Sequence, residues 1–343
     1  LTNSLRFMQA CEGDYIEDFN GLIFDVKGLV HPPRRVIAFP RFIPDKEGDR
    51  LRRGIAYRKV YGLSERYEFL KKNFPQYLVY NPLFDEHLCE IPIENIKHHY
   101  KPANCLKSLR KKPVLDCVET EALEFATLLK ENANISWSKL GVSGSLLVRL
   151  HATASDIDLV VYGSKNCREV HEALQTLFDE EEGFVRAYTV KDLEKLFDFR
   201  SKDTQISFEA FVRTESRKVL QGKFKRRDYF IRFVKDWNEI GETYGSTLYK
   251  NVGYAKITAT IVDDSDSLFT PCTYKVESVK FLEGPIFTPM KEISSFRGRF
   301  CEQARNGETV VAQGKVERVQ KTGQEAYYRL LLGSNPTDYM ILT

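Results

Sequence analysis

The run from residue 141 to residue 162 constrains this chain more than any other feature of its sequence. A short apolar strand leads into Gly144 and Ser145, and twelve residues after Gly144 come Asp156 and Asp158, with apolar residues between and after them. Side chains along a strand alternate between its two faces, so the two carboxylates share one face and the apolar residues occupy the other. The run therefore predicts a strand, a tight glycine turn, a helix and a second strand that presents a pair of acids.

This arrangement suits phosphate and metal chemistry. Gly144 lets the backbone approach a ligand closely, and the N–H groups at the start of a helix expected over residues 145–151, with the Ser145 hydroxyl, form a site for a phosphate. Carboxylates on a rigid strand beside a phosphate are the ligands that Mg²⁺ prefers. A pair of metal ions that clamps an in-line phosphoryl displacement requires a third carboxylate nearby.

Two residues compete for the role of third carboxylate. Asp228 opens a predicted strand over residues 228–234, on which it shares a face with Arg232, so that Arg232 is expected to meet phosphate oxygens. Glu209 is the alternative, although its apolar neighbours are typical of a helix that we expect over residues 204–221. A site with only two carboxylates is the remaining interpretation.

The run around Gly144, Ser145, Asp156 and Asp158 resembles the signature of the polymerase-β-type nucleotidyltransferase superfamily: an apolar residue, Gly-Ser, a spacer, and Asp-x-Asp on a strand. The resemblance implies that the Gly-Ser pair contacts the phosphates of an incoming nucleoside triphosphate and that the aspartates, with Asp228, bind two Mg²⁺ ions. Arg149 departs from the pattern, since many minimal members have a glycine there. Across its whole length the chain also resembles an archaeal family of predicted nucleotidyltransferases, which brings no known substrate.

The function that this resemblance implies is an enzyme activity. The chain would transfer a nucleoside monophosphate from a triphosphate to an acceptor hydroxyl, with RNA as the favoured acceptor, and release pyrophosphate by a two-metal mechanism. The alternative is a non-catalytic nucleotide- or RNA-binding protein that retains the fold. A transferase of the antitoxin-like or protein-modifying kind is a third interpretation, disfavoured because those are small single domains.

The pattern of elements along the chain predicts a multidomain α+β fold. We expect an N-terminal mixed, β-rich domain over residues 1–113, with strands near 21–26, 35–39 and 55–61 and a polar linker over 101–113. A central α/β nucleotidyltransferase domain with a mixed sheet follows over 114–243. In it, capping-box patterns at Asn166–Glu169 and Thr189–Asp192 predict helix starts. Short strands separated by turn residues predict an all-β barrel or sandwich over 244–343.

One stretch of the central domain is strongly basic. Residues 213–235 contain nine lysines and arginines against Glu215 and Asp228, which could hold a triphosphate or an RNA backbone, or else form solvated surface. A second group of metal-binding residue types fits no standard zinc spacing. It comprises His87, Cys89, His98, His99 and Cys105.

Composition predicts a cytoplasmic protein without a membrane partner. Hydrophobic residues make up 42% of the 343, enough to bury real cores, and no apolar run reaches the length of a membrane helix. The sequence begins without a signal-peptide pattern, and its seven scattered cysteines, an odd number, are typical of a reducing compartment. The net charge of +3 is too small to imply a partner.

Overall fold

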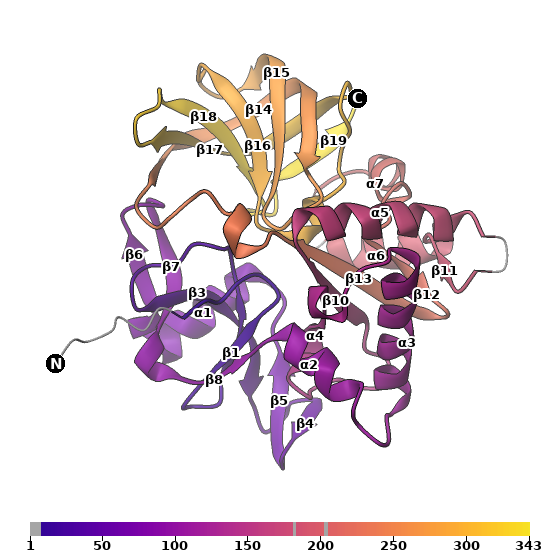
Figure 1. The fold of residues 1–343 in the computed structure, drawn as a ribbon. Helices are drawn as coiled ribbons and strands as arrows, with labels where there is room; N and C mark the ends of the chain where they lie inside the picture. The colour runs from indigo at the N-terminus through magenta and orange to yellow at the C-terminus, as the bar shows by residue number, and fades with distance from the viewer. Residues whose placement is uncertain (1–7, 181–182, 202–204) are drawn as a thin grey trace. The chain divides into compact units, whose positions relative to one another are not determined.

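The computed structural model describes residues 8–180, 183–201 and 205–343, and its chain divides into two compact units (Figure 1). The first unit comprises Leu1–Tyr80, His87–Arg186 and Lys223–Tyr244, and the second comprises Asn81–Glu86, Ala187–Gly222 and Gly245–Thr343. The boundary expected near residue 113 thus falls inside the first unit, whereas the one expected near residue 243 coincides with a change of unit.

The N-terminal part of the first unit is built on an antiparallel sheet. Its main path runs β4-β5-β3-β2-β1-β8, and β7 pairs with both β3 and β6. Helix α1 (Leu63–Asn73) follows β5. The strands expected near residues 21–26, 35–39 and 55–61 are confirmed. The strands are β1 (Tyr15–Asp18), β2 (Ile23–Val26), β3 (Arg35–Pro44), β4 (Arg50–Arg52), β5 (Ile55–Lys59), β6 (Leu78–Asn81), β7 (Glu86–Pro92) and β8 (Ile96–Tyr100).

The polar segment over residues 101–113 is not a linker. It contains helix α2 (Pro102–Leu109), which begins with a proline at its first position and buries Leu106 and Leu109. Proline is well suited to the first helical position because its missing N–H would have no partner there. The polar residues that suggested a linker lie on the outer side of this helix and in the loop after it.

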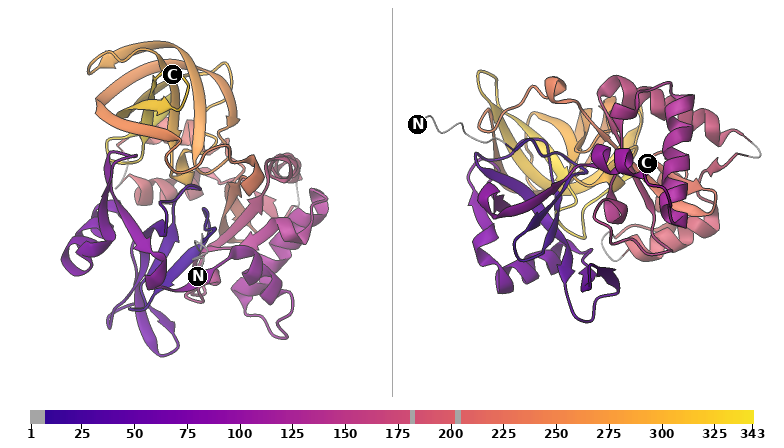
Figure 2. Two further views of the ribbon diagram at one scale, coloured as in Figure 1. Left: turned by 60° about the vertical axis from the view of Figure 1, so that its left-hand side comes forward. Right: turned by 60° about the horizontal axis from the view of Figure 1, so that its bottom comes forward.

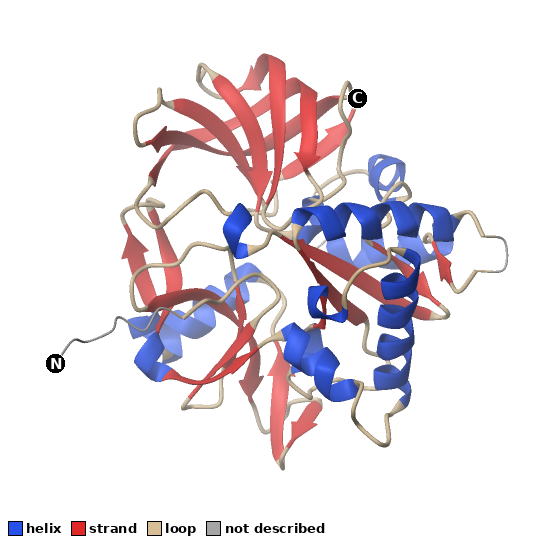
Figure 3. Cartoon of the chain, in the orientation of Figure 1, coloured by secondary structure: helices blue, strands red, loops and turns tan. Residues whose placement is uncertain are grey.

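A mixed sheet of order β11-β12-β13-β10-β9 forms the rest of the first unit. Strand β10 runs parallel to β13 and antiparallel to β9. Helices α3 and α5 cover one face of this sheet (Figure 3), where Phe125 of α3 packs on Tyr229 of β13. The elements are α3 (Cys117–Asn132), β9 (Leu140–Val142), α4 (Gly144–Leu147), β10 (Ile157–Tyr162), α5 (Ser164–Phe178), β11 (Val185–Arg186), β12 (Gln221–Phe224) and β13 (Arg227–Val234).

Two expected helix features of this region are wrong. Helix α5 begins at Ser164, so Asn166 lies inside it and donates to the Tyr162 carbonyl instead of capping the helix. Helix α4 is a single turn of four residues, because the chain leaves it at Val148 and Arg149 has a φ of 57°. A helix expected over residues 145–151 is therefore much shorter than the pattern indicated.

The second unit holds a closed barrel of five strands, as expected for the all-β C-terminal segment (Figure 2). Strands β14, β15, β16, β18 and β17 follow one another around it, and pairing of β17 with β14 closes the ring, with β19 beside β17. The strands are β14 (Thr247–Asp266), β15 (Cys272–Glu283), β16 (Met290–Ser295), β17 (Thr309–Lys321), β18 (Tyr327–Leu332) and β19 (Tyr339–Leu342).

Two helices complete the second unit. Helix α6 (Val190–Arg200) begins with the capping box expected at Thr189 and Asp192. Helix α7 (Phe208–Glu215) replaces the longer helix expected over residues 204–221, of which residue 204 lies outside the described residues. Helix α7 ends at Glu215, whose buried carboxylate accepts hydrogen bonds from Lys218 and Gln221 in the segment that follows.

Single-turn 3₁₀ helices link several elements of both units, at Pro75–Tyr77, Ile93–Asn95, Trp137–Lys139, Trp237–Glu239 and Gly298–Phe300. Among the helices of residues 8–180, 183–201 and 205–343, none combines the length and the apolar character that spanning a bilayer requires.

Candidate active site

The two aspartates of the Asp-x-Asp pair lie where strand β10 begins. Asp156 directly precedes β10, Asp158 is its second residue, and both side chains are half-buried. Burial raises the pKa of Asp158, and the charge of Asp156 raises it further, to about 7. A raised pKa means that the positive charges near Asp158 do not fully offset its burial and the negative charge of Asp156. The pair fits a divalent cation, because carboxylates on a rigid strand are donors that suit Mg²⁺.

The turn between β9 and α4 lies directly against this pair. The Ser143 N–H donates to the Asp158 carbonyl over 2.8 Å. Gly144 follows with a φ of +61°, and a Cβ at that position would come within 1.9 Å of the Asp158 carboxylate oxygen Oδ2. Glycine is thus the residue that allows this turn to touch the carboxylate. The next residue, Ser145, is buried, and its hydroxyl has no hydrogen-bond partner among the described residues.

The register of the sheet brings one of the two third-carboxylate candidates to the pair. Ile157 lies opposite Tyr229 in the parallel pairing of β10 with β13, so Asp228 is level with Asp156 and on the same face. The Asp228 side chain is 54% exposed and forms an ion pair with Lys223 at 2.8 Å. The sheet therefore leaves it open to a ligand at the edge of the site.

The other candidate, Glu209, belongs to the second unit. It lies on α7, its side chain is 86% exposed, and its nearest cation is Arg213 one turn along the same helix, at 3.5 Å. This is the arrangement of an ordinary solvated helix face.

Arg232, expected to meet phosphate, lies two residues beyond the level of Asp158 and has a protein partner. Its guanidinium donates to Glu12 over 2.7 Å, and Glu12 is fully buried. Burial opposes the charge of Arg232, but Glu12 and Asp25 together hold its pKa above the ordinary value. Arg232 is thus a positive charge on the same face of the sheet as Asp158, and it is bound to Glu12 of the N-terminal segment.

The N-terminal sheet covers the face of the mixed sheet that carries the aspartates. A Cβ at Gly13 would lie 2.9 Å from the Val160 side chain, and the Ser143 hydroxyl donates to the Gly13 carbonyl over 2.6 Å. Leu147 and Val148, in and just after α4, share a buried apolar cluster with residues of this sheet. The cluster members from the sheet are Tyr15, Ile23, Phe42 and Tyr57.

Sequence reasoning missed the contribution of this sheet. Five carboxylates between residues 12 and 25 are buried, and each is held by hydrogen bonds or cations. A run of acids within apolar strands was the signal, because charged groups are rarely buried without partners. The five are Glu12 (with Arg232), Asp14 (with His99), Glu17 (with Arg52), Asp18 (with Tyr77) and Asp25 (with Lys27).

The basic stretch over residues 213–235 is mostly neutralised by the protein itself. Seven of its nine lysines and arginines form ion pairs with carboxylates of the same unit. Paired cations offer little to an RNA backbone, which needs free positive charge. The pairs are Arg213–Glu209, Arg217–Glu308, Lys218–Glu215, Lys223–Asp228, Lys225–Glu124, Arg227–Glu121 and Arg232–Glu12.

Two other groups of metal-binding residue types have structural explanations. Asp116, Glu119 and His151 lie close enough to share an ion, but Asp116 and Glu119 form the capping box of α3, and His151 bonds Asp116. Within the region of His87 to Cys105, His99 bonds Asp14, and Cys89 is fully buried with a raised pKa caused by that burial.

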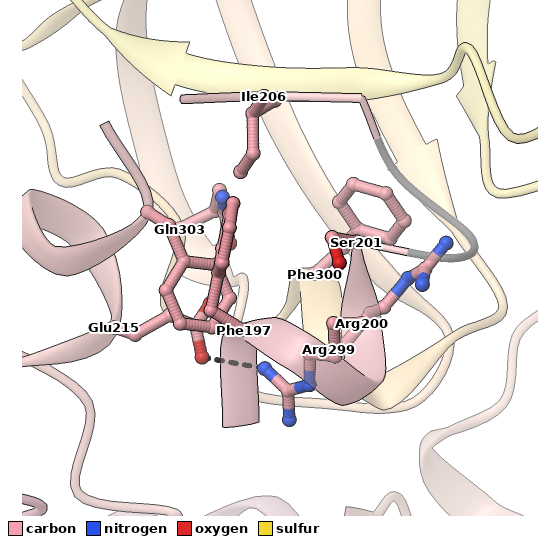
Figure 4. A pocket seen from close by; sticks show the side chains of 9 residues that line it. Phe197, Arg200, Ser201, Ile206, Glu215, Arg299, Phe300 and Gln303 are labelled. Atoms are coloured by element: carbon pink, nitrogen blue, oxygen red, sulfur yellow. Dashed lines mark hydrogen bonds and ion pairs between the residues drawn. The ribbon is translucent and has the colours of Figure 1, made fainter. Parts of the chain in front are cut away.

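A cavity in the second unit is too small for a nucleotide. It is lined by α6, α7 and residues 299–303, with the ion pair between Arg200 and Glu215 at its wall (Figure 4). Its volume of about 30 Å³ leaves room for about two water molecules. The aspartate pair, not this cavity, is the candidate active site.

Comparison with known proteins shows a full-length relationship. The chain is 32% identical over 329 residues to the "Uncharacterized protein MJ1086" of Methanocaldococcus jannaschii, and the alignment covers 94% of each chain. This relative is archaeal, which agrees with the archaeal character expected from the whole-chain resemblance. No family model matches the chain, and no solved structure matches it.

Proposed function

The chain belongs to the same protein family as MJ1086 of M. jannaschii, and from its site we propose that it is a metal-dependent nucleotidyltransferase. In this proposal an acceptor hydroxyl attacks the α-phosphorus of a nucleoside triphosphate. The new bond joins the acceptor oxygen to phosphorus, and the bond from phosphorus to the bridging oxygen breaks. Pyrophosphate leaves, and the acceptor proton passes to a carboxylate or to water.

The observation that carries this proposal is the contact between Gly144 and Asp158. A glycine turn with a buried, unpartnered serine hydroxyl touches one member of a carboxylate pair whose charges are not balanced. Such a turn can bring a phosphate next to the carboxylates, which a turn with any larger residue could not. Positioning of this kind and neutralisation of charge do most of the work in phosphoryl transfer.

We assign the remaining roles by position. Asp156 and Asp158, with Asp228 at the edge, would hold two Mg²⁺ ions, which supply charge neutralisation at the attacking and leaving oxygens. Asp228 is also the group proposed to align the acceptor hydroxyl and take its proton. Arg232, which Glu12 holds in place by a hydrogen bond, contributes a positive charge near Asp158. Ser145 donates its hydroxyl to a phosphate oxygen.

A second candidate function is binding of a nucleotide without catalysis. The ion pair between Asp228 and Lys223 favours it, because a carboxylate bound to a lysine must leave that partner before it can contact an acceptor hydroxyl. The two functions differ in one respect that can be measured, the formation of a covalent product.

The test offers ATP, CTP, GTP and UTP, each labelled at the α-phosphate, with Mg²⁺ and with pooled RNA, protein or small molecules from the cell. We expect label to enter one of these pools, with RNA the first to examine. Asp158→Asn should abolish the transfer, whereas Asp179→Asn, an exposed residue at the end of α5, should leave it unchanged. Transfer that survives Asp158→Asn overturns the mechanism, and binding without transfer supports the second candidate.

A further inference from the structure

Two cations of the N-terminal sheet, Arg41 and Lys59, form no ion pair with a carboxylate among the described residues, although the charges of Asp25 and Asp158 act on Arg41. Arg41 of β3 donates to the Val60 carbonyl over 3.2 Å and lies 4.9 Å from the centre of the Tyr61 ring. The Lys59 ammonium, at the end of β5, lies 4.9 Å from the same ring centre. Both side chains are half-buried. Two cations that share one aromatic ring repel each other, and an anion between them would relieve that repulsion.

The lack of an ion pair sets Arg41 and Lys59 apart from the other cations nearby. The neighbouring cations Lys27, Arg52 and Arg232 are each bound to a buried carboxylate. A half-buried charge costs free energy unless a counter-charge lies near it. The charges of Arg41 and Lys59 instead act on Asp158, and Asp25 also acts on Arg41. No ion pair in the described part of the chain holds either cation, so both keep N–H donors that a ligand beside Asp158 can use.

The sheet directs Lys59 toward the glycine turn. Lys59 lies opposite Phe42 in the pairing of β5 with β3 and two residues from Tyr57, so the three share one face. Phe42 and Tyr57 pack in the same apolar cluster as Leu147 and Val148, next to the turn at Gly144 and Ser145. The face of the sheet that carries Lys59 is thus the face that covers the candidate active site.

A β-bulge directs Arg41 to the same place. Ile23 pairs with Phe42 and Phe24 pairs with Pro40, which leaves Arg41 as the extra residue of β3. A bulge of this kind re-aims a side chain, and bulges are common beside active sites. The charges of Lys59 and Arg41 both act on Asp158, where they partly offset the rise in its pKa that burial and Asp156 cause.

A third group completes the set. The Ser145 hydroxyl is buried, lacks a hydrogen-bond partner among the described residues, and follows the glycine that touches Asp158. Buried hydroxyls nearly always find a partner, so this unsatisfied hydroxyl, next to the glycine that touches Asp158, points to a missing acceptor. Phosphate oxygens accept from hydroxyl, guanidinium and ammonium donors alike.

We propose that Arg41, Lys59 and Ser145 form a polyphosphate-binding site, in which the N-terminal sheet supplies the cations that hold the triphosphate of the nucleotide. The assignment to a nucleotide rests on the proposed function, whereas the anion site rests only on the contacts above. Each group is linked to Asp158, the two cations through their charge and Ser145 through the adjacent Gly144, and such a grouping suits a short polyphosphate. A nucleic-acid backbone is instead bound along a track of positive charge.

The test measures binding of inorganic tripolyphosphate by isothermal titration calorimetry, without divalent metal. Arg41→Gln and Lys59→Gln should each raise the Kd about tenfold or more, since each removes a charge-assisted contact. Lys59→Arg should keep most of the affinity. Lys46→Gln, which removes an exposed charge of the same sheet region, should change the Kd less than about twofold. A cooperative thermal unfolding transition will be required of every variant, to establish that the variant is folded.

Two outcomes overturn the inference. One is unchanged tripolyphosphate affinity in the double variant Arg41→Gln/Lys59→Gln. The other is that this double variant loses binding of a single-stranded RNA oligonucleotide while tripolyphosphate binding stays, which would assign the cations to an RNA backbone. Failure of the proposed function is distinguishable, because the wild type would then bind tripolyphosphate through these residues yet transfer no label. Asp158→Asn should bind tripolyphosphate at least as tightly as the wild type.

Discussion

Gly144 lies so close to Asp158 that no side chain fits between them: a Cβ on Gly144 would come within 1.9 Å of the carboxylate oxygen Oδ2 and 2.7 Å of Cγ. The turn that holds Gly144 and the strand that holds Asp158 are tied by a backbone hydrogen bond from Ser143. Any substitution at Gly144 must therefore displace the carboxylate, the turn, or both.

Gly144→Ala should disrupt the site and destabilise the fold. We expect it to lower the free energy of unfolding by about 2–4 kcal/mol, from the left-handed backbone and the collision together. Gly54→Ala is the matched control, because Gly54 has a φ of +78° but no atom within 4 Å of an added Cβ. It should cost about 1 kcal/mol, for the backbone alone. Urea denaturation measures the free energy of unfolding of both variants. If both lose the same amount, the close contact between Gly144 and Asp158 is contradicted.

Asp158→Asn should stabilise the protein in the absence of divalent metal. The pKa of Asp158 is raised to about 7, first by burial and then by Asp156, so its ionised form destabilises the fold increasingly from pH 3.8 and fully above pH 7. At pH 8 the asparagine should add about 1–3 kcal/mol to the free energy of unfolding. Mg²⁺ should raise the Tm of the wild type but not that of the variant. A variant that is less stable than the wild type, or that keeps the Mg²⁺ response, contradicts the assignment.

Glu12→Gln should be among the most destabilising conservative changes in the first unit. Glu12 is fully buried and binds Arg232 at 2.7 Å and the Gly28 N–H at 2.8 Å. Removing its charge leaves Arg232 without its main partner, at a cost of about 3 kcal/mol. Arg213→Gln breaks the exposed pair with Glu209 and should cost at most about 0.5 kcal/mol. Chemical denaturation of both variants checks the difference, and a neutral Glu12→Gln would refute the structural role of Arg232.

Stability should fall on mild acidification because of His31. Its Nε2 donates to the Ala10 carbonyl, and its Nδ1 accepts from the Ile37 N–H, a bond that requires a neutral ring. Burial lowers its pKa from 6.5 to about 4, so between these values only the unfolded chain takes up the proton. From pH 7.5 to pH 5 this linkage should remove about 2 kcal/mol of stability.

His31→Gln keeps a donor and an acceptor without a titrating ring. It should be less stable than the wild type at pH 7.5 but lose less stability between pH 7.5 and pH 5. If the two proteins lose the same free energy of unfolding over this range, His31 is not the group responsible.

The parts of the site that lie close together in the sequence were predictable from it. Alternation along one strand placed Asp156 and Asp158 on one face, and the spacing from Gly144 indicated a turn next to them. The strand that begins near Asp228 was also predictable, because its apolar residues alternate with polar ones. Its parallel pairing with β10, which brings Asp228 level with Asp156, is known only from the structure.

The contribution of the N-terminal sheet could not be predicted in this way. The position of Arg41 depends on a bulge, and the bulge exists only because β2 pairs with β3 in a particular register. The partner of Arg232 lies 220 residues away in the sequence, and no local pattern links them. The helix expected over residues 204–221 is shorter, Phe208–Glu215, and the buried contacts of Glu215 with Arg200, Lys218 and Gln221 could not be read from local helix propensity.

The most direct test of the central claim is a crystal structure with Mn²⁺ and a non-hydrolysable nucleoside triphosphate analogue. We expect anomalous signal from Mn²⁺ within bonding distance of Asp156 and Asp158. We also expect the triphosphate to lie against Gly144 and Ser145, within reach of Arg41 and Lys59. Metal and nucleotide bound elsewhere, with the two aspartates in contact only with water, would contradict it.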